Sequence, residues 1–187
     1  MSEREGARPG APASDSGTAT ADGIRIEAVT ADLLPTYRDV RIAALIDSPR
    51  AFWTTYEQAS SRTDDLWAQW LEEGPQTWLA FAGGSPVGTV GLWRGDDQPR
   101  EEVTLIGMWV ATVVRGSGVA ERLVRAALEA ASHAGRRRVV LEVAHENSRA
   151  WAFYSRMGFR PTGETGSMPW DPSVTEERMV LDLVTGP

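Results

Sequence analysis

The chain has 187 residues with 26 acidic and 19 basic side chains, which gives a net charge of −7 and a pI near 4.9. Hydrophobic residues make up 42% of it, enough to build the core of one ordinary domain. With 0 Cys, the sequence excludes disulfides, zinc–thiolate sites and a cysteine nucleophile. Every basic residue is arginine, and the lack of lysine excludes a Schiff-base enzyme and a Walker-type phosphate loop.

The charge balance bears on partners and location. An acidic protein repels nucleic acid and anionic lipid, and the one basic run, Arg136 to Arg138, is short. The 2 His lie on separate segments, so we expect no metal site. No window approaches the roughly 20 apolar residues that span a bilayer, and the N-terminus lacks the apolar core of a secretion signal. We therefore expect a soluble, cytoplasmic protein without a nucleic-acid or membrane partner.

The chain divides into two regions. Residues 1–22 are rich in Gly, Ala, Pro, Ser and Thr, and this composition predicts a disordered tail, because it buries too little surface to offset the entropy of ordering. From residue 23 to 187 strand-like and helix-like patterns alternate, which predicts a single layered domain of α/β (α+β) type.

The predicted elements follow from hydrophobic periodicity. Asp64 or Asp65 could cap the second helix, and Gly74-Pro75 would end it. The third helix is strongly amphipathic, and its Glu121 and Arg125 stand at the favourable i, i+4 spacing. Strands are expected at 24–28, 77–82, 87–93, 102–110, 138–144, 159–163 and 178–184, and helices at about 32–47, 66–73, 119–134 and 148–157.

The segment Arg115-Gly116-Ser117-Gly118-Val119-Ala120 lies between a predicted strand and a predicted helix. Its glycines free the backbone amides to converge on an anion, the helix adds its positive dipole end, and Arg115 can add a charge. Three interpretations fit the pattern. It is a tight turn without a ligand, a dinucleotide-binding loop (although the sixth position from Gly116 holds Glu121 rather than a small residue), or a loop that binds the pyrophosphate of an acyl-CoA.

A second block of residues supports the last interpretation. The loop resembles the R/Q-x-x-G-x-G/A signature of the GNAT superfamily of acyl-CoA-dependent N-acyltransferases. Leu141-Glu142-Val143, Asn147, Ala150, Phe153-Tyr154 and Gly158-Phe159 resemble the L-x-V…N…A…Y…G-F block of the same superfamily, in the right order and at the right distance. The resemblance implies a GNAT domain over 23–187, with a mixed, mostly antiparallel central sheet and helices on both faces.

The resemblance also implies how the cofactor is held. The loop amides would bind the pyrophosphate, and the preceding strand would splay from its neighbour and hold the pantetheine and acetyl carbonyl through backbone groups. Asn147 stands just ahead of a helix, where a role as N-cap is sufficient, and the resemblance adds a contact to the CoA arm. The implied cofactor-binding residues are Met108, Trp109, Val110, Arg115, Gly116, Ser117, Gly118, Val119, Ala120 and Asn147.

For catalysis the resemblance assigns Tyr154 as the general acid that protonates the departing thiolate, and the alternative is a half-buried packing aromatic. Glu142 is similar to the strand glutamate proposed as the base in ribosomal-protein N-terminal acetyltransferases, and the alternative is an outward-facing strand carboxylate. Other candidates for the base are Glu27, Glu101, Glu102, His145 and a water chain.

These features together imply acetyl transfer from acetyl-CoA to a primary amine, with a small-molecule acceptor favoured and no metal involved. Without cysteine, direct attack in a ternary complex is the natural mechanism. Protein N-terminal acetylation and a non-catalytic acyl-CoA sensor remain as alternatives, with an NAD-dependent oxidoreductase more remote. A homodimer is common in the superfamily. Most tryptophans are expected in the core, some could line an acceptor pocket, and Trp170 is a candidate lid residue.

Overall fold

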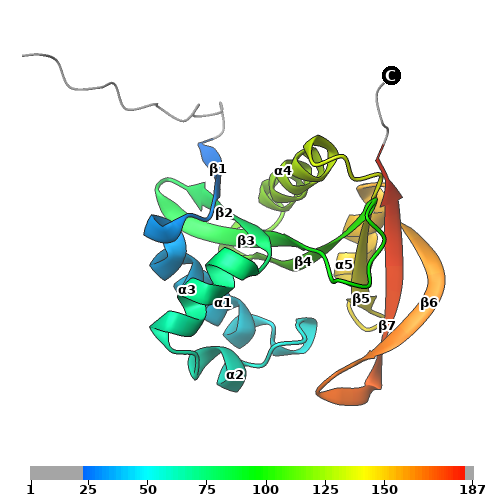
Figure 1. Ribbon diagram of the computed structural model, residues 1–187, viewed down its shortest axis with the longest axis horizontal. Helices are drawn as coiled ribbons and strands as arrows, with labels where there is room; N and C mark the ends of the chain where they lie inside the picture. Colours follow the sequence, from blue (N-terminus) through cyan, green and yellow to red (C-terminus); the bar gives the residue numbers. More distant parts are fainter. Residues whose placement is uncertain (1–22, 184–187) are drawn as a thin grey trace, which may run out of the picture.

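The computed structural model describes residues 23–183, so the expected tail at 1–22 lies outside the described residues, as does 184–187. The described chain forms one seven-stranded sheet (Figure 1). All neighbouring strands are antiparallel except β4 and β5, which are parallel. In spatial order the strands are β1 Ile24–Ala28, β2 Gln76–Ala82, β3 Ser85–Trp93, β4 Glu102–Val110, β5 Arg138–Ala144, β7 Asp171–Asp182 and β6 Arg160–Met168.

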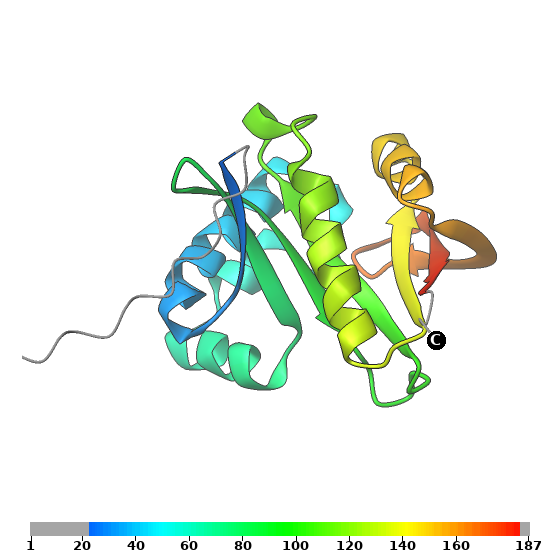
Figure 2. The ribbon, with the colours of Figure 1, turned by 90° about the horizontal axis from the view of Figure 1, so that it is seen from above.

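Helices cover both faces of this sheet. α4 and α5 pack on one face, and α1, α2 and α3 pack on the other (Figures 1 and 2). The helices are α1 Leu34–Asp47, α2 Tyr56–Ser60, α3 Asp64–Glu73, α4 Val119–His133 and α5 Ser148–Arg156, with 3₁₀ turns at Ala31–Leu33, Pro49–Ala51 and Thr112–Val114. The expected fold class, a mostly antiparallel sheet between two helical layers, is confirmed.

Each face of the sheet has its own core. On one, Leu123 and Val124 of α4 are fully buried against Leu141 and Met179 of the strands. On the other, Trp67 of α3 packs beneath Tyr37 and Leu79. Burying one such large apolar side chain contributes about 1.5–3 kcal/mol. The expectation of tryptophans in the core holds for Trp67 and Trp78, whereas Trp53 and Trp93 are exposed.

Two local predictions differ from the structure. α2 is not predicted, because five residues are too few to show helical periodicity; its start is instead fixed by a capping box between Thr55 and Gln58. α3 is capped by Thr63, whose hydroxyl accepts from the Leu66 amide at 3.3 Å, and not by Asp64 or Asp65, which lie inside its first turn. There their charges favour the positive end of the helix dipole.

The last hairpin is also longer than predicted. β6 extends to Met168 and β7 begins at Asp171, so that only Pro169 and Trp170 form the turn between them. Pro161 is compatible with β6 because this strand lies at the edge of the sheet.

The central feature for function is the divergence of β4 and β5. They pair only where Glu102, Val103 and Thr104 meet residues 138–140, and then separate (Figure 2). β4 also carries a β-bulge: Val90 of β3 faces both Gly107 and Met108, and Gly107 has φ +64°. The rest of β4 therefore has an edge toward β5 without ladder bonds.

Candidate active site

The glycine loop lies where β4 leads into α4. Gly116 and Gly118 have φ angles of +86° and +87°, and a Cβ added at either would meet nothing within 4 Å. Glycine is therefore required there by backbone conformation and not by lack of space. Gly118 is the N-cap of α4, so the two left-handed residues turn the chain into the helix start.

Several amides of this loop are unused by the protein. The Arg115 amide donates to the Thr112 carbonyl, and the amide and hydroxyl of Ser117 both donate to the Val114 carbonyl. Within residues 23–183, no acceptor engages the amides of Gly116, Gly118, Val119 or Ala120. Free amides at the positive end of a 15-residue helix form a site for an anion such as a diphosphate.

The Arg115 side chain does not point its charge into this site. Its Nε donates to the Val110 carbonyl at 2.8 Å, and its Nη2 forms an ion pair with Asp47. The guanidinium is therefore folded back over the end of β4, and its charge is compensated by a carboxylate. In this arrangement Arg115 anchors the loop to the end of β4 and does not face the free amides.

The strand ahead of the loop has one paired and one open edge. Trp109 and Val110 pair with Thr89 and Gly88 of β3, while the other edge faces the gap toward β5. Met108, in the bulge, and Trp109 are partly exposed. Unpaired backbone groups in such a gap are donors and acceptors for a ligand that enters between the strands.

Asn147 is the N-cap of α5. Its Oδ1 accepts a hydrogen bond of 3.1 Å from the Ala150 amide, so the capping role predicted from the sequence is confirmed. This places the cap directly after β5, on the far side of the gap from α4 (Figure 2).

Tyr154 lies on the α5 side of the sheet. It is buried, its ring packs edge-on against Phe159 at 5.6 Å, and it belongs to the core cluster that contains Leu141 and Val143. Its hydroxyl makes no hydrogen bond to a described residue and is not among the polar atoms sealed from solvent. Burial raises the pKa of Tyr154, so the phenol stays neutral.

Glu142 lies on the opposite face of β5, because successive side chains of a strand alternate and its neighbours Leu141 and Val143 face Tyr154. Its partner across the ladder is Arg178, and Glu176 follows diagonally. Glu142 is exposed at the surface, but the surrounding protein partly desolvates its carboxyl and raises its pKa. Arg178 lowers this pKa, and nearby Glu176 and Glu102 raise it further. The two candidate catalytic side chains thus lie on opposite faces of the sheet.

The alternative bases are already engaged. Glu102 is buried and forms an ion pair with Arg178. The others are Glu101, which pairs with Arg138 at 3.5 Å, Glu27, which pairs with Arg25 on the edge strand β1, and His145, whose Nε2 lies 3.1 Å from Glu177. Glu142 has no ion pair within the described part of the chain, so the geometry favours it among these carboxylates.

The segment that follows α1 is hydrogen-bonded to the β6–β7 hairpin, a contact that the sequence did not reveal. Beyond the end of α1, Trp53 Nε1 donates to the buried carboxylate of Glu176 at 2.8 Å. Trp170, the candidate lid residue, donates from Nε1 to the Phe52 carbonyl at 2.8 Å. The segment at 49–53 is therefore tied to the β6–β7 hairpin, on the same face of the sheet as Glu142.

Arg41 is a second residue that sequence patterns did not single out. Its guanidinium lies 4.5 Å from the centre of the Phe52 ring, and Nη1 is 3.9 Å from the Cβ position at the bulged Gly107. Nη1 is buried without a partner among the described residues, and burial lowers the pKa of Arg41. A largely buried cation without a carboxylate partner is costly to desolvate.

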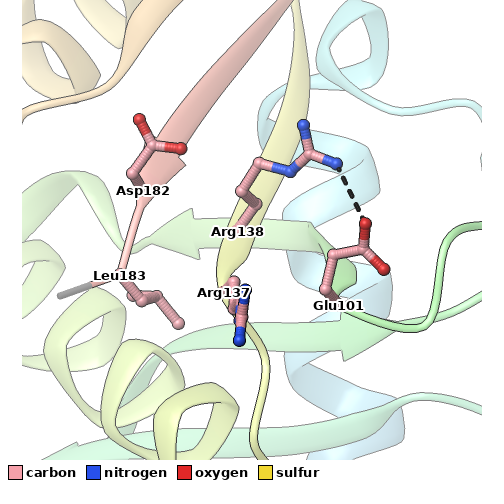
Figure 3. Close-up of a pocket in the computed structure, with 5 residues that line it drawn as sticks. All are labelled: Glu101, Arg137, Arg138, Asp182 and Leu183. Atoms are coloured by element: carbon pink, nitrogen blue, oxygen red, sulfur yellow. Dashed lines mark ion pairs between the residues drawn. The ribbon is translucent and has the colours of Figure 1, made fainter. Parts of the chain in front are cut away.

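A distinct hollow lies elsewhere on the protein. It measures about 590 Å³ and is lined by Glu101, Arg137, Arg138, Asp182 and Leu183 (Figure 3). These residues stand where β4 and β5 begin and β7 ends, at the opposite end of the parallel pair from the glycine loop. The hollow is open and is lined by Arg137 and Arg138 of the basic run, whereas Tyr154 and Glu142 do not line it.

Within residues 23–183, no three His, Asp or Glu side chains gather closely enough to bind a metal ion. The same part of the chain has no helix of the length and apolar character needed to cross a bilayer.

Comparison with known proteins identifies a family and related sequences. Residues 42–159 match the model of the acetyltransferase (GNAT) family. The chain is 36% identical over 118 residues to N-acetyltransferase 8 of Rattus norvegicus, an alignment that covers 60% of this chain and 53% of the relative. The chain thus spans about half the length of the curated relatives it matches.

Solved structures share the fold at low sequence identity. yncA of Salmonella typhimurium, described with its cofactor acetyl-CoA, has a TM-score of 0.71 and 17% identity, covering 88% of this chain and 96% of that one. Ribosomal-protein-alanine N-acetyltransferase of Brucella melitensis has a TM-score of 0.68 and 21% identity, covering 85% and 99%. With the family model matching more than half of its residues, this chain belongs to the GNAT family of acetyltransferases.

Proposed function

We propose that this protein transfers the acetyl group of acetyl-CoA to a primary amine, with a small molecule as the favoured acceptor. The observation that carries the proposal is the set of free amides at Gly116, Gly118, Val119 and Ala120, held at the start of α4 beside the gap between β4 and β5. The loop offers a site for a diphosphate, and the adjoining gap offers a slot lined by backbone groups of the strands. When bound there, acetyl-CoA would supply an activated thioester carbonyl.

The side chains around the gap would divide the proton transfers. An ammonium must lose a proton before its nitrogen can attack, and Glu142 can accept it, directly or through water, because its raised pKa makes it a stronger base than an ordinary glutamate. Backbone amides on the open edge of β4 can stabilise the negative charge that develops on the carbonyl oxygen.

Tyr154 would serve the departing thiolate from the other face. A neutral phenol can donate a hydrogen bond or its proton to sulfur, and burial keeps Tyr154 neutral. The raised pKa disfavours complete proton transfer to a thiolate, whose own acid has a pKa near about 8.5. The hydrogen bond is therefore the larger part of its role.

Isothermal titration with acetyl-CoA tests the cofactor, and a panel of amines, amino acids, polyamines, aminoglycosides and peptides, assayed by free thiol released, tests the reaction. Tyr154→Phe should lower turnover far more than acetyl-CoA affinity, while Tyr56→Phe, an exposed tyrosine, should change neither. Failure of the wild-type protein to bind acetyl-CoA would refute the proposal.

The same panel separates the alternatives. Peptides acetylated at the N-terminus as the sole acceptors would indicate a protein N-terminal acetyltransferase. Binding without transfer to any amine would indicate a sensor.

A further inference from the structure

Asp47, the last residue of α1, accepts hydrogen bonds from four side chains. Its Oδ2 accepts from Trp109 Nε1 at 2.9 Å and from the Ser48 hydroxyl at 2.8 Å, and it also pairs with Arg115 Nη2. Its Oδ1 accepts from the Thr112 hydroxyl at 3.0 Å. One carboxylate thus connects the end of α1 with β4, with the turn that follows it and with the glycine loop.

These contacts make a charged and well-satisfied cluster. The hydrogen bond from Trp109, together with those from Ser48, Thr112 and Arg115, holds the pKa of Asp47 well below its usual range. Asp47 is therefore ionised at every physiological pH. Hydrogen bonds to an ionised acceptor are about twice as strong as neutral ones.

The cluster also decides where the Arg115 charge lies. Its guanidinium is shared between Asp47 and the Val110 carbonyl, so it braces the loop against the end of β4. An anion at the loop would meet the free amides of Gly116, Gly118, Val119 and Ala120, and a guanidinium whose charge is already compensated. Two opposite consequences can be imagined for Asp47: it holds the loop in its binding conformation, or it competes with the ligand for Arg115.

We propose that Asp47 is a positioning residue for the acetyl-CoA site, which holds Arg115 on the end of β4 and thereby fixes the amides of the glycine loop. The identity of the ligand rests on the proposed function, but the effect of Asp47 on the loop does not. Four donors bind one carboxylate, which supports the first role, in which Asp47 holds the loop in place. A diphosphate that competed for Arg115 would have to displace it from two acceptors at once, the Val110 carbonyl and Asp47.

Titration calorimetry with acetyl-CoA tests this on Asp47→Ala, Asp47→Asn, Arg115→Ala and the double variant Asp47→Ala/Arg115→Ala. Loss of such a charged contact is expected to weaken binding about tenfold or more in either alanine variant. The double variant should bind no more weakly than the weaker single one, because the two residues act as one unit. Asp47→Asn should fall between wild type and Asp47→Ala, since its amide oxygen still accepts hydrogen bonds.

Asp39→Ala is the matched control. Asp39 lies on the same helix, is exposed, and has no hydrogen bond or ion pair to a described residue, so its replacement should leave acetyl-CoA affinity unchanged. Tighter binding by Asp47→Ala would show competition for Arg115 and overturn the proposal, as would a loss in Arg115→Ala with none in Asp47→Ala.

Hydrogen exchange of the ligand-free protein gives a readout that does not depend on the cofactor. Peptides covering 110–121 should exchange faster in Asp47→Ala and Asp47→Asn than in wild type or Asp39→Ala, while peptides from β2 stay unchanged. If wild type fails to bind acetyl-CoA, the proposed function is wrong, but this exchange pattern still decides the role of Asp47. Unchanged exchange in both Asp47 variants would contradict it.

Discussion

The indole of Trp53 and the carboxylate of Glu176 are joined by a hydrogen bond of 2.8 Å between segments 123 residues apart in sequence. Trp53 is 56% exposed whereas Glu176 is only 4% exposed. The exposed partner thus supplies the hydrogen bond that a buried carboxylate needs, and it ties the segment beyond α1 to β7.

Trp53→Phe should therefore destabilise the protein. Leaving a buried acceptor without its donor costs about 1–3 kcal/mol. Because the Trp53 hydrogen bond lowers the raised pKa of Glu176, it stabilises the ionised form. The destabilisation should be largest at neutral pH, where Glu176 is ionised. It should become smaller in acid, where Glu176 is protonated in both the folded and the unfolded state and only a neutral hydrogen bond is lost. Melting temperatures across pH measure this. Trp93→Phe, at an exposed tryptophan without a hydrogen bond to a described residue, is the control, and equal effects of the two changes would contradict the prediction.

Glu142 should determine the acid side of the pH profile. As a base it must be ionised, and burial, Glu176 and Glu102 raise its pKa against the lowering effect of Arg178. The fall of kcat/KM toward low pH should therefore occur above the ordinary glutamate pKa of about 4.3. Glu142→Gln should remove this limb and reduce kcat by about 10²- to 10⁴-fold. Glu129→Gln, on the exposed side of α4, should leave the profile unchanged. A limb that persists in Glu142→Gln would assign it to another group.

The glycine loop should tolerate alanine poorly although space is available. Gly116→Ala and Gly118→Ala force a Cβ into left-handed conformations, at a cost of about 1–2 kcal/mol each. Part of this strain is relieved when the loop moves, so acetyl-CoA affinity should fall together with the melting temperature. Gly166→Ala is a matched control, because that position is equally open but does not have a positive φ. Wild-type affinity in both loop variants would show that the amides do not bind the diphosphate.

Arg41→Met should make the protein more stable and less active. The substitution removes a largely buried cation without a described partner, whose desolvation costs several kcal/mol. It also loses a desolvated cation–π contact with Phe52, worth about 2 kcal/mol. Because Arg41 lies beside the bulge of β4, turnover should fall. Chemical denaturation and the thiol-release assay measure the two effects. A lower stability would show that the guanidinium is better compensated than its contacts indicate.

Sequence reasoning succeeded where the signal is local. The glycines at 116 and 118, the amphipathic pattern of α4 and the Asn147 cap each involve residues within a few positions of one another, and the structure has the helix, the two left-handed turns and the cap. Glu121 and Arg125 also form the expected i, i+4 ion pair at 2.7 Å.

It could not find contacts between distant segments. Asp47 and Arg115 are 68 residues apart, and nothing in the surroundings of either indicates the other. The β-bulge at Gly107 depends on the register with β3, which periodicity does not specify. For the same reason Arg115 was predicted to face the ligand: its chemistry suits an anion, but the nearest anion is supplied by α1.

The pairing of β4 and β5 over only three residues affects the stability of the ligand-free protein. Along the rest of the two strands, backbone groups that a continuous sheet would pair are left to hydrogen-bond with water. The ligand-free protein is therefore less stable than the protein with a ligand bound between the strands. By mass action, a higher ligand concentration then increases resistance to heat and to proteolysis. Supply of the occupant would regulate the abundance of the protein as well as its turnover.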